Sequence, residues 1–70
     1  MSNPISIQLN GEAFELAQPC SVVELIEQLK INHGRVAVEV NREIIPRSEH
    51  TSTLLAANDV VEIIHAIGGG

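Results

Sequence analysis

The chain has 70 residues, a formal net charge of −5 and 44% hydrophobic residues. This length fits one small domain, and the apolar content excludes low-complexity disorder. The negative charge and the single aromatic residue, Phe14, argue against a nucleic-acid binder and against an anionic membrane surface, and they favour a basic protein partner.

The first predicted element is a β-hairpin over residues 5–16. ISIQL carries apolar residues at every second position, as a half-buried strand does. Asn10-Gly11 follows, and this pair favours a type I′ turn because both positions take positive φ. EAFEL then returns as the second strand, with Phe14 and Leu16 turned inward.

A helix is predicted over residues 22–31. Ser21 and Glu24 have the spacing of a capping box, in which each side chain accepts from the other residue's backbone amide. Apolar residues then recur at i, i+3, i+4 and i+7, which places them on one helical face. Gly34 is suited to a left-handed cap at the end of the helix.

The second half of the chain reads as three strands. VAVEV is the third strand, and IIP is a short fourth strand that Pro46 confines to an edge or ends. The segment SEHTSTLLA is irregular with a possible helical turn, and Leu54 and Leu55 are expected to fill the core there. VVEIIHAI is a long last strand.

This β-β-α-β-β-β order predicts an α+β fold of the β-grasp, or ubiquitin-like, kind. About five strands form a mixed, mostly antiparallel sheet, and the one main helix packs on one face. The first and last strands run parallel at the centre. The domain is expected over residues 1–67 and a flexible glycine tail over 68–70. The predicted core comprises Ile7, Leu9, Phe14, Leu16, Leu25, Ile26, Leu29, Val36, Val38, Val61 and Ile63.

The body of the chain shows no catalytic set and no metal site. His33, His50 and His65 do not form a metal-ligand spacing with one another or with Cys20, so each reads as a surface or partly buried residue. Cys20 precedes the helix, where a thiolate is favoured, but packing is the commoner role of an unpaired cysteine. A single cysteine and the absence of a signal-like start predict a cytoplasmic protein.

The chemistry is therefore expected in the last three residues. Gly68, Gly69 and Gly70 have no Cβ atoms, so they can thread a channel that is too narrow for other residues. They reach about 10 Å beyond the last strand and carry the α-carboxylate at the tip. Such a carboxylate is a handle that another enzyme can activate, although a frayed terminus is the ordinary alternative.

The whole chain resembles the ThiS family of thiamine-pathway sulfur carriers. The resemblance rests on QLNGE, SVVELIEQL, VAVEVNREIIPR and NDVVEIIHAIGGG, in that order. It implies a β-grasp fold and a terminal carboxylate, here that of Gly70, that an E1-like enzyme of the ThiF type adenylates with Mg-ATP. Sulfur from a cysteine desulfurase then gives a thiocarboxylate, and thiazole synthase of the ThiG type accepts that sulfur. The carrier is a cosubstrate, binds no cofactor itself, and inserts Gly68 and Gly69 with the tip.

Three other functions remain open on the sequence. The small subunit of molybdopterin synthase shares the fold, the tail and the thiocarboxylate. A ubiquitin-like modifier would be joined through Gly70 to lysines of target proteins. A plain interaction domain would have a tail without a role.

A partner-docking surface is expected on the last strand. If Val61 and Ile63 face the core, alternation turns Glu62, Ile64 and Ala66 outward. An exposed apolar Ile64 flanked by the carboxylates of Glu39 and Glu62 suits a basic partner.

Overall fold

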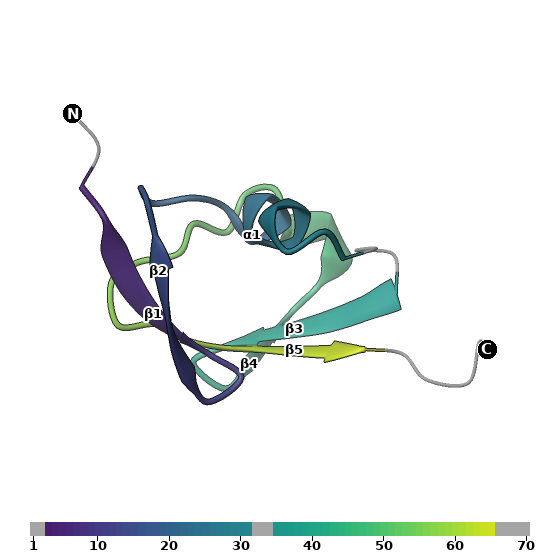
Figure 1. The fold of residues 1–70 in the computed structure, drawn as a ribbon. Helices are drawn as coiled ribbons and strands as arrows, with labels where there is room; N and C mark the ends of the chain where they lie inside the picture. Colours follow the sequence, from purple (N-terminus) through teal and green to yellow (C-terminus); the bar gives the residue numbers. More distant parts are fainter. Residues whose placement is uncertain (1–2, 32–34, 66–70) are drawn as a thin grey trace.

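The computed structural model describes residues 3–31 and 35–65. Its elements follow the predicted order, and Figure 1 shows them as one curved sheet with the helix across one face. They are, in chain order, β1 (Ile5–Leu9), β2 (Glu12–Leu16), α1 (Val22–Gln28), β3 (Val36–Val40), β4 (Glu43–Ile45), the 3-10 helix η2 (Arg47–Glu49) and β5 (Val60–His65). No helix in the described part of the chain is long and apolar enough to cross a membrane.

The sheet has the strand order β2-β1-β5-β3-β4. β1 and β5 run parallel, with Gln8 opposite Val60 and Leu9 opposite Val61, while the other neighbouring strands run antiparallel. The parallel pair is possible because the helix lies in the crossover between the two strands. This is the predicted β-grasp topology, and it places the last strand at the centre of the sheet.

An asparagine is the first residue of each of the two hairpin turns. Asn10 and Gly11 both have positive φ, which confirms the predicted type I′ turn. Asn41 and Arg42 also have positive φ, of 53° and 71°, at the β3–β4 turn. Both asparagines then use their side chains as well as their backbones, and each of them contacts β5.

The helix starts as predicted and ends earlier. The Ser21 side chain accepts from the Glu24 amide and the Glu24 carboxylate accepts from the Ser21 amide, which confirms the capping box. The helix ends at Gln28, because Lys30 adopts φ +59° and its amide donates to the Glu27 carbonyl. The Ile31 amide donates to the Ile26 carbonyl, so the pattern is a Schellman cap centred on Lys30. The prediction of a helix to residue 31 is therefore wrong, and Gly34 lies outside the described residues.

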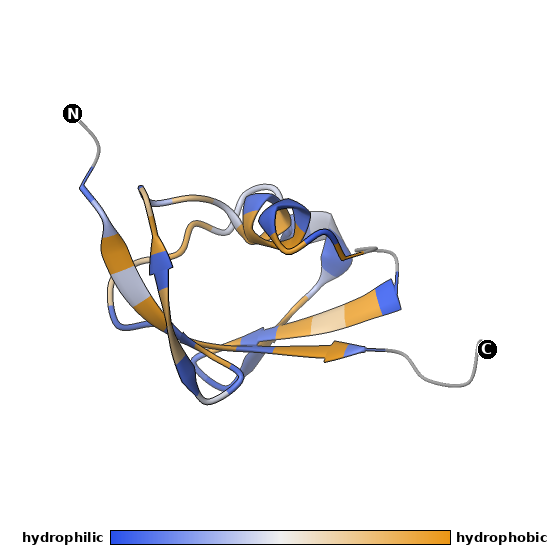
Figure 2. Cartoon of the chain, viewed as in Figure 1, coloured by the Kyte–Doolittle hydropathy of each residue, from blue (hydrophilic) through white to orange (hydrophobic). Residues whose placement is uncertain are grey.

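The core lies between α1 and the inner face of the sheet. Figure 2 shows that apolar residues recur along the strands and along α1. Of the predicted core, Leu9, Phe14, Leu29 and Val36 are only partly buried and pack around its margin. The prediction that Leu54 lies in the core is wrong, because its side chain is 70% exposed. Of this pair, only Leu55 is buried in the core. The buried apolar residues are Ile7, Leu16, Cys20, Val22, Leu25, Ile26, Val38, Val40, Leu55, Val61 and Ile63.

Pro46 ends β4 as expected and begins the turn η2. β4 pairs only with β3 and forms an edge of the sheet. The predicted last strand over residues 60–67 is confirmed through His65, and the boundary expected at residue 67 lies outside the described residues.

Candidate functional site

The candidate site is built on β5, the strand that leads toward the glycine end of the chain. β5 lies between β1 and β3. It pairs with β3 from Val61 to His65, and with β1 at Val60 and Val61. Gly68, Gly69, Gly70 and Ala66 lie outside the described residues. The described part of the site is therefore the strand, its anchors and the face that it shares with β3 and β4.

Two side-chain anchors fix the position of β5. Asn10 continues the ladder after β1 has ended, because its Oδ1 accepts from the Ile63 amide at 2.8 Å while its own amide donates to the Val61 carbonyl at 2.9 Å. At the start of the strand, Asn41 Oδ1 accepts from the Val60 amide at 2.9 Å, and Asn41 Nδ2 donates to Asp59 at 3.0 Å. The last strand is thus tied to both hairpin turns.

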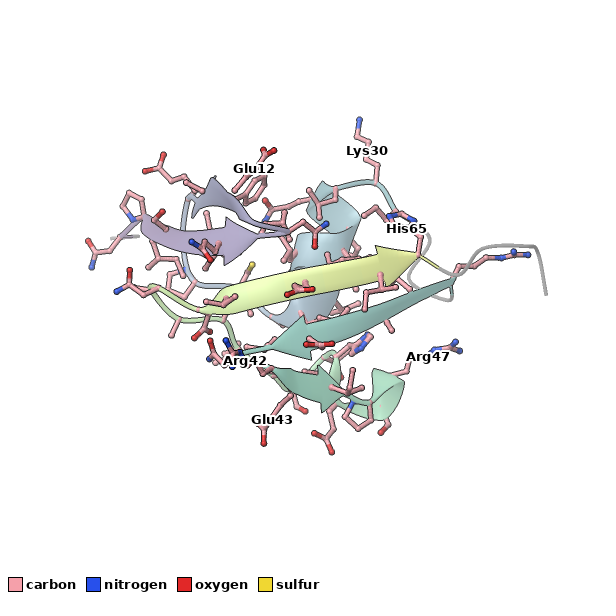
Figure 3. The ribbon with its side chains drawn as sticks, turned by 90° about the horizontal axis from the view of Figure 1, so that it is seen from below. Glu12, Lys30, Arg42, Glu43, Arg47 and His65 are labelled. Atoms are coloured by element: carbon pink, nitrogen blue, oxygen red, sulfur yellow. The ribbon has the colours of Figure 1, made fainter. Side chains whose placement is uncertain are left out.

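The predicted docking residues of the described chain come together on the outer face of the sheet. Glu39 of β3 lies directly opposite Glu62 of β5, and Ala37 lies opposite Ile64. Ile64 is 49% exposed, as the alternation predicted. This face is turned away from α1, and Figure 3 views it directly, with the helix behind the sheet.

Sequence reasoning missed Ile44 on this face. Ile44 of β4 pairs with Glu39 and is 60% exposed. The signal was present, because Ile45 pairs with the buried Val38 and alternation then turns Ile44 outward. The face is therefore a mosaic in which two isoleucines, from β4 and β5, flank a pair of carboxylates. We call this set, Glu39, Ile44, Glu62 and Ile64, the outer face.

The carboxylates of the outer face belong to the same cross-strand pair. Like charges that lie directly opposite each other on a sheet reduce its stability by a few tenths to about 1 kcal/mol. A positive group from a partner that sits between them would remove this repulsion. The arrangement therefore favours contact with a lysine or an arginine.

Cys20 and His50 lie outside this face and are buried in the core. Cys20 is buried, and its burial, followed by the charge of Glu24, raises the pKa of the thiol above 9.0, so packing is its role. His50 is also buried, and its Nε2 donates to the Ile45 carbonyl at 3.0 Å. His65 is exposed and His33 lies outside the described residues. Across residues 3–31 and 35–65, no three side chains of metal-ligand type are grouped.

The sequence of this chain is similar to those of several known proteins. It is 42% identical to the protein ycf40 of Porphyra purpurea over 66 residues, covering 94% of this chain and 93% of that one. It is 32% identical to the sulfur carrier protein ThiS of Bacillus subtilis over 65 residues, covering 91% of this chain and 98% of that one. A 66-residue match at 33% identity covers 94% of this chain but 20% of a thiazole synthase of Paramagnetospirillum magneticum.

The fold comparison agrees with the sequence comparison. The crystal structure of the thiamine biosynthesis protein ThiS of Geobacter metallireducens superposes with a TM-score of 0.83 and 30% identity, covering 94% of this chain and 100% of that one. The model of the ThiS family matches residues 7–70, which include the central strand and the terminal glycines. The chain belongs to the ThiS family.

Proposed function

We propose that this protein carries sulfur for the formation of the thiazole ring of thiamine, as a thiocarboxylate on Gly70. The observation that carries the proposal is that the family match extends through Gly70, so the terminal glycines are part of the shared pattern. Relatives named sulfur carrier protein and thiazole synthase support the thiamine pathway over the molybdopterin pathway.

The carboxylate of Gly70 needs activation before sulfur can replace its oxygen. In the proposed reaction, an E1-like adenylating enzyme of the ThiF type uses Mg-ATP, and a carboxylate oxygen attacks the α-phosphate and displaces pyrophosphate. The terminal sulfur of a persulfide, supplied by a cysteine desulfurase, then attacks the acyl carbon and AMP leaves. A second thiol attacks the sulfur of the cysteine that carried the persulfide and forms a disulfide with it, which breaks the sulfur–sulfur bond and releases the thiocarboxylate. This protein is a cosubstrate, and ATP and Mg²⁺ are bound by the enzyme.

The fold suits this role because it separates a fixed body from a reactive tip. Five residues follow His65, and their extended length is at most about 18 Å. A partner can therefore bind the sheet and still receive Gly70 in an enclosed site. Glycines at positions 68–70 suit passage through a narrow channel, because they lack Cβ atoms.

We assign partner docking to the outer face, together with Ala66, which follows β5. Ile44 and Ile64 supply apolar contact, and Glu39 and Glu62 supply the charge that a basic surface complements. The adenylating enzyme and the thiazole synthase both have to receive the same tip, so we expect both to use this face. Cytoplasmic enzymes of this kind would place the carrier in the cytoplasm.

Thiazole synthase is the partner that the comparisons support. In the Paramagnetospirillum magneticum enzyme, a segment of 66 residues similar to this chain is part of the thiazole synthase polypeptide. Joining a carrier to its acceptor raises the effective concentration of one for the other. The same pairing, made between separate chains, is what we propose here.

The decisive experiment is the intact mass of the protein isolated from its own cells. A mass gain equal to the replacement of one oxygen by sulfur, lost when Gly70 is deleted, is the expected result. Adducts joined through Gly70 to other proteins would instead indicate a modifier. Unmodified protein in cells that synthesise thiamine would contradict the carrier function.

Removal of Gly70, or addition of one residue after it, should abolish adenylation by the ThiF-type enzyme. Either change displaces the carboxylate by up to about 3.5 Å, and a reacting group in an enclosed site tolerates far less. The melting temperature should stay within about 2 °C of the parent value, because the buried core lies between Ile7 and Ile63. Normal adenylation of either variant would show that the terminus is not the reactive group.

A further inference from the structure

Positive charge gathers at the end of the molecule where β5 finishes. Arg35 directly precedes Val36, which pairs with His65, the last described residue of β5. Lys30 lies beyond the last turn of α1, at this same end in Figure 3. Arg47, also at this end, already interacts within the molecule. Three of the four Lys and Arg residues of a protein with net charge −5 thus lie at one end.

Lys30 has a backbone conformation that favours glycine. It has φ +59° at the left-handed position of the Schellman cap, where glycine fits without a steric cost. Its side chain is exposed, and it has no ion-pair partner within residues 3–31 and 35–65. The backbone conformation alone would favour glycine at this position. We therefore look for a role of the Lys30 ammonium group.

Arg42 has the same backbone conformation at the opposite end. Its φ is +71° in the β3–β4 turn, next to the point where β5 begins. Glu43 follows it in the chain, and Asn41 before it binds Asp59, so acidic residues occur in the segments around this cation. Figure 3 shows Arg42 and Glu43 together, at the far end of the sheet from Lys30 and His65.

We propose that Lys30 and Arg35, which we call the basic end, contact acidic side chains around the opening through which thiazole synthase receives Gly70. This inference rests on the proposed function. The chain continues from His65 at the basic end, and Gly70 follows after only five residues, so a protein that encloses the tip can bring the rim of its opening against Lys30 and Arg35. An acidic rim complements these charges, while a basic surface complements Glu39 and Glu62 on the outer face.

Two patches of opposite sign fix the orientation of docking better than one. An acidic patch alone would be attracted to a basic surface in many rotations. With the basic end added, one rotation satisfies both patches and the reverse rotation opposes like charges. That rotation points the end of β5 at the opening of the acceptor site.

The test compares Lys30→Gly with Arg42→Gly in the full 70-residue chain. Both variants remove one positive charge and replace a residue of positive φ with glycine, so both should fold at least as stably as the parent. They differ in the end that loses its charge. Association with thiazole synthase from the same organism is measured by stopped-flow mixing at low and at high salt.

Lys30→Gly should lower the association rate constant about three- to tenfold at low salt, and the difference should shrink as salt is added. Arg35→Gln should act in the same direction. Arg42→Gly should change the rate less than about twofold. Equal slowing by Lys30→Gly and Arg42→Gly, or no slowing by either Lys30→Gly or Arg35→Gln, would overturn the basic end as a contact.

The same experiment separates the two claims. A parent chain that associates and receives sulfur, beside variants that do so equally fast, overturns the basic end and leaves the carrier function intact. A parent chain that does not associate with thiazole synthase overturns the carrier function, and the inference with it.

Discussion

Single asparagine residues do two tasks in this domain. Asn10 provides a left-handed backbone for the turn and an acceptor for the Ile63 amide, 53 positions away in the sequence. Asparagine is among the few residues other than glycine that adopt this conformation readily. Its polar side chain can also replace the strand neighbour that β5 loses where β1 ends.

Replacing Asn10 with glycine should therefore destabilise the domain although glycine suits the turn. The Ile63 amide would lose its partner in a partly buried site, at a cost of about 1–3 kcal/mol in the free energy of unfolding. Asn10→Asp is the matched control, because it keeps the acceptor, and it should lose less. Urea denaturation of the two variants gives the comparison, and equal losses would mean that the Ile63 hydrogen bond contributes little.

The buried thiol of Cys20 makes a prediction about alkaline pH. Burial and then the charge of Glu24 raise the pKa of Cys20 above 9.0 in the folded state. A raised folded-state pKa contributes stability below the unfolded-state pKa, and this contribution is lost as pH rises through the folded-state pKa. The free energy of unfolding should thus fall more steeply above pH 9 in the parent than in Cys20→Ala.

Denaturation midpoints of both chains at pH 7 and pH 10 test this difference. The packing lost in Cys20→Ala affects both pH values alike, so only the change with pH matters. Parallel pH profiles would show that the thiol does not titrate differently on folding.

At the residue scale, the sequence predicts contacts between residues that are close along the chain, but not contacts between distant residues. The capping box of Ser21 and Glu24 was predictable because both partners lie within one helical turn. The burial of His50 was not, because it depends on the Ile45 carbonyl and on the Val23 amide, which donates to the His50 carbonyl from the other half of the chain. Lys30 was missed as the helix cap because Gly34 carried the stronger local signal.

At the scale of elements, three strands combine to make the outer face. Ile44, Glu39 and Glu62 form one row across β4, β3 and β5, and Ile64 lies two residues further along β5. Alternation predicted which side chains of β5 face outward, and Glu39 was expected beside them, as the pairing of Glu39 with Glu62 confirms. Ile44 was missed, because its outward direction follows from the register in which Ile45 pairs with the buried Val38.

Ile64→Asp should weaken binding to both the adenylating enzyme and thiazole synthase without unfolding the domain. Ile64 is already half exposed, so the change removes apolar contact from the outer face and adds a charge that an apolar partner surface opposes. Leu54→Asp is the matched control, because Leu54 is exposed and lies in the connection before β5, opposite Ser21 and outside the five strands of the sheet. Calorimetric titration with each enzyme supplies the affinities.

Normal affinity of Ile64→Asp for both enzymes would move docking to another surface. Charge reversal in Glu62→Lys adds a second check on the same face. It should mainly slow association, and added salt should reduce the effect.

At the scale of the whole molecule, β5 joins the two halves of the chain. β1 is its neighbour from the first half, and β3 is its neighbour from the second half. Val61 and Ile63 of β5 are buried in the core, together with residues of α1. The helix-containing crossover and the parallel pairing were predictable from element order, since the last strand is the longest and among the most apolar.

The central position of β5 predicts the order in which amide hydrogens exchange with solvent. β5 pairs with β3 from Val61 to His65, and its first residues also pair with β1 and with the Asn10 side chain, so the amides of Val61 and Ile63 should open only when the whole domain unfolds. β4 has three residues and pairs with β3 alone, so it can detach without breaking the core contacts of β5. Its amides should therefore exchange first among the strands. Hydrogen–deuterium exchange followed by NMR measures both rates. Equal protection of β4 and β5 would mean that the edge strand is part of the same cooperative unit, and that a partner meets Ile44 on a strand as firmly held as β5 itself.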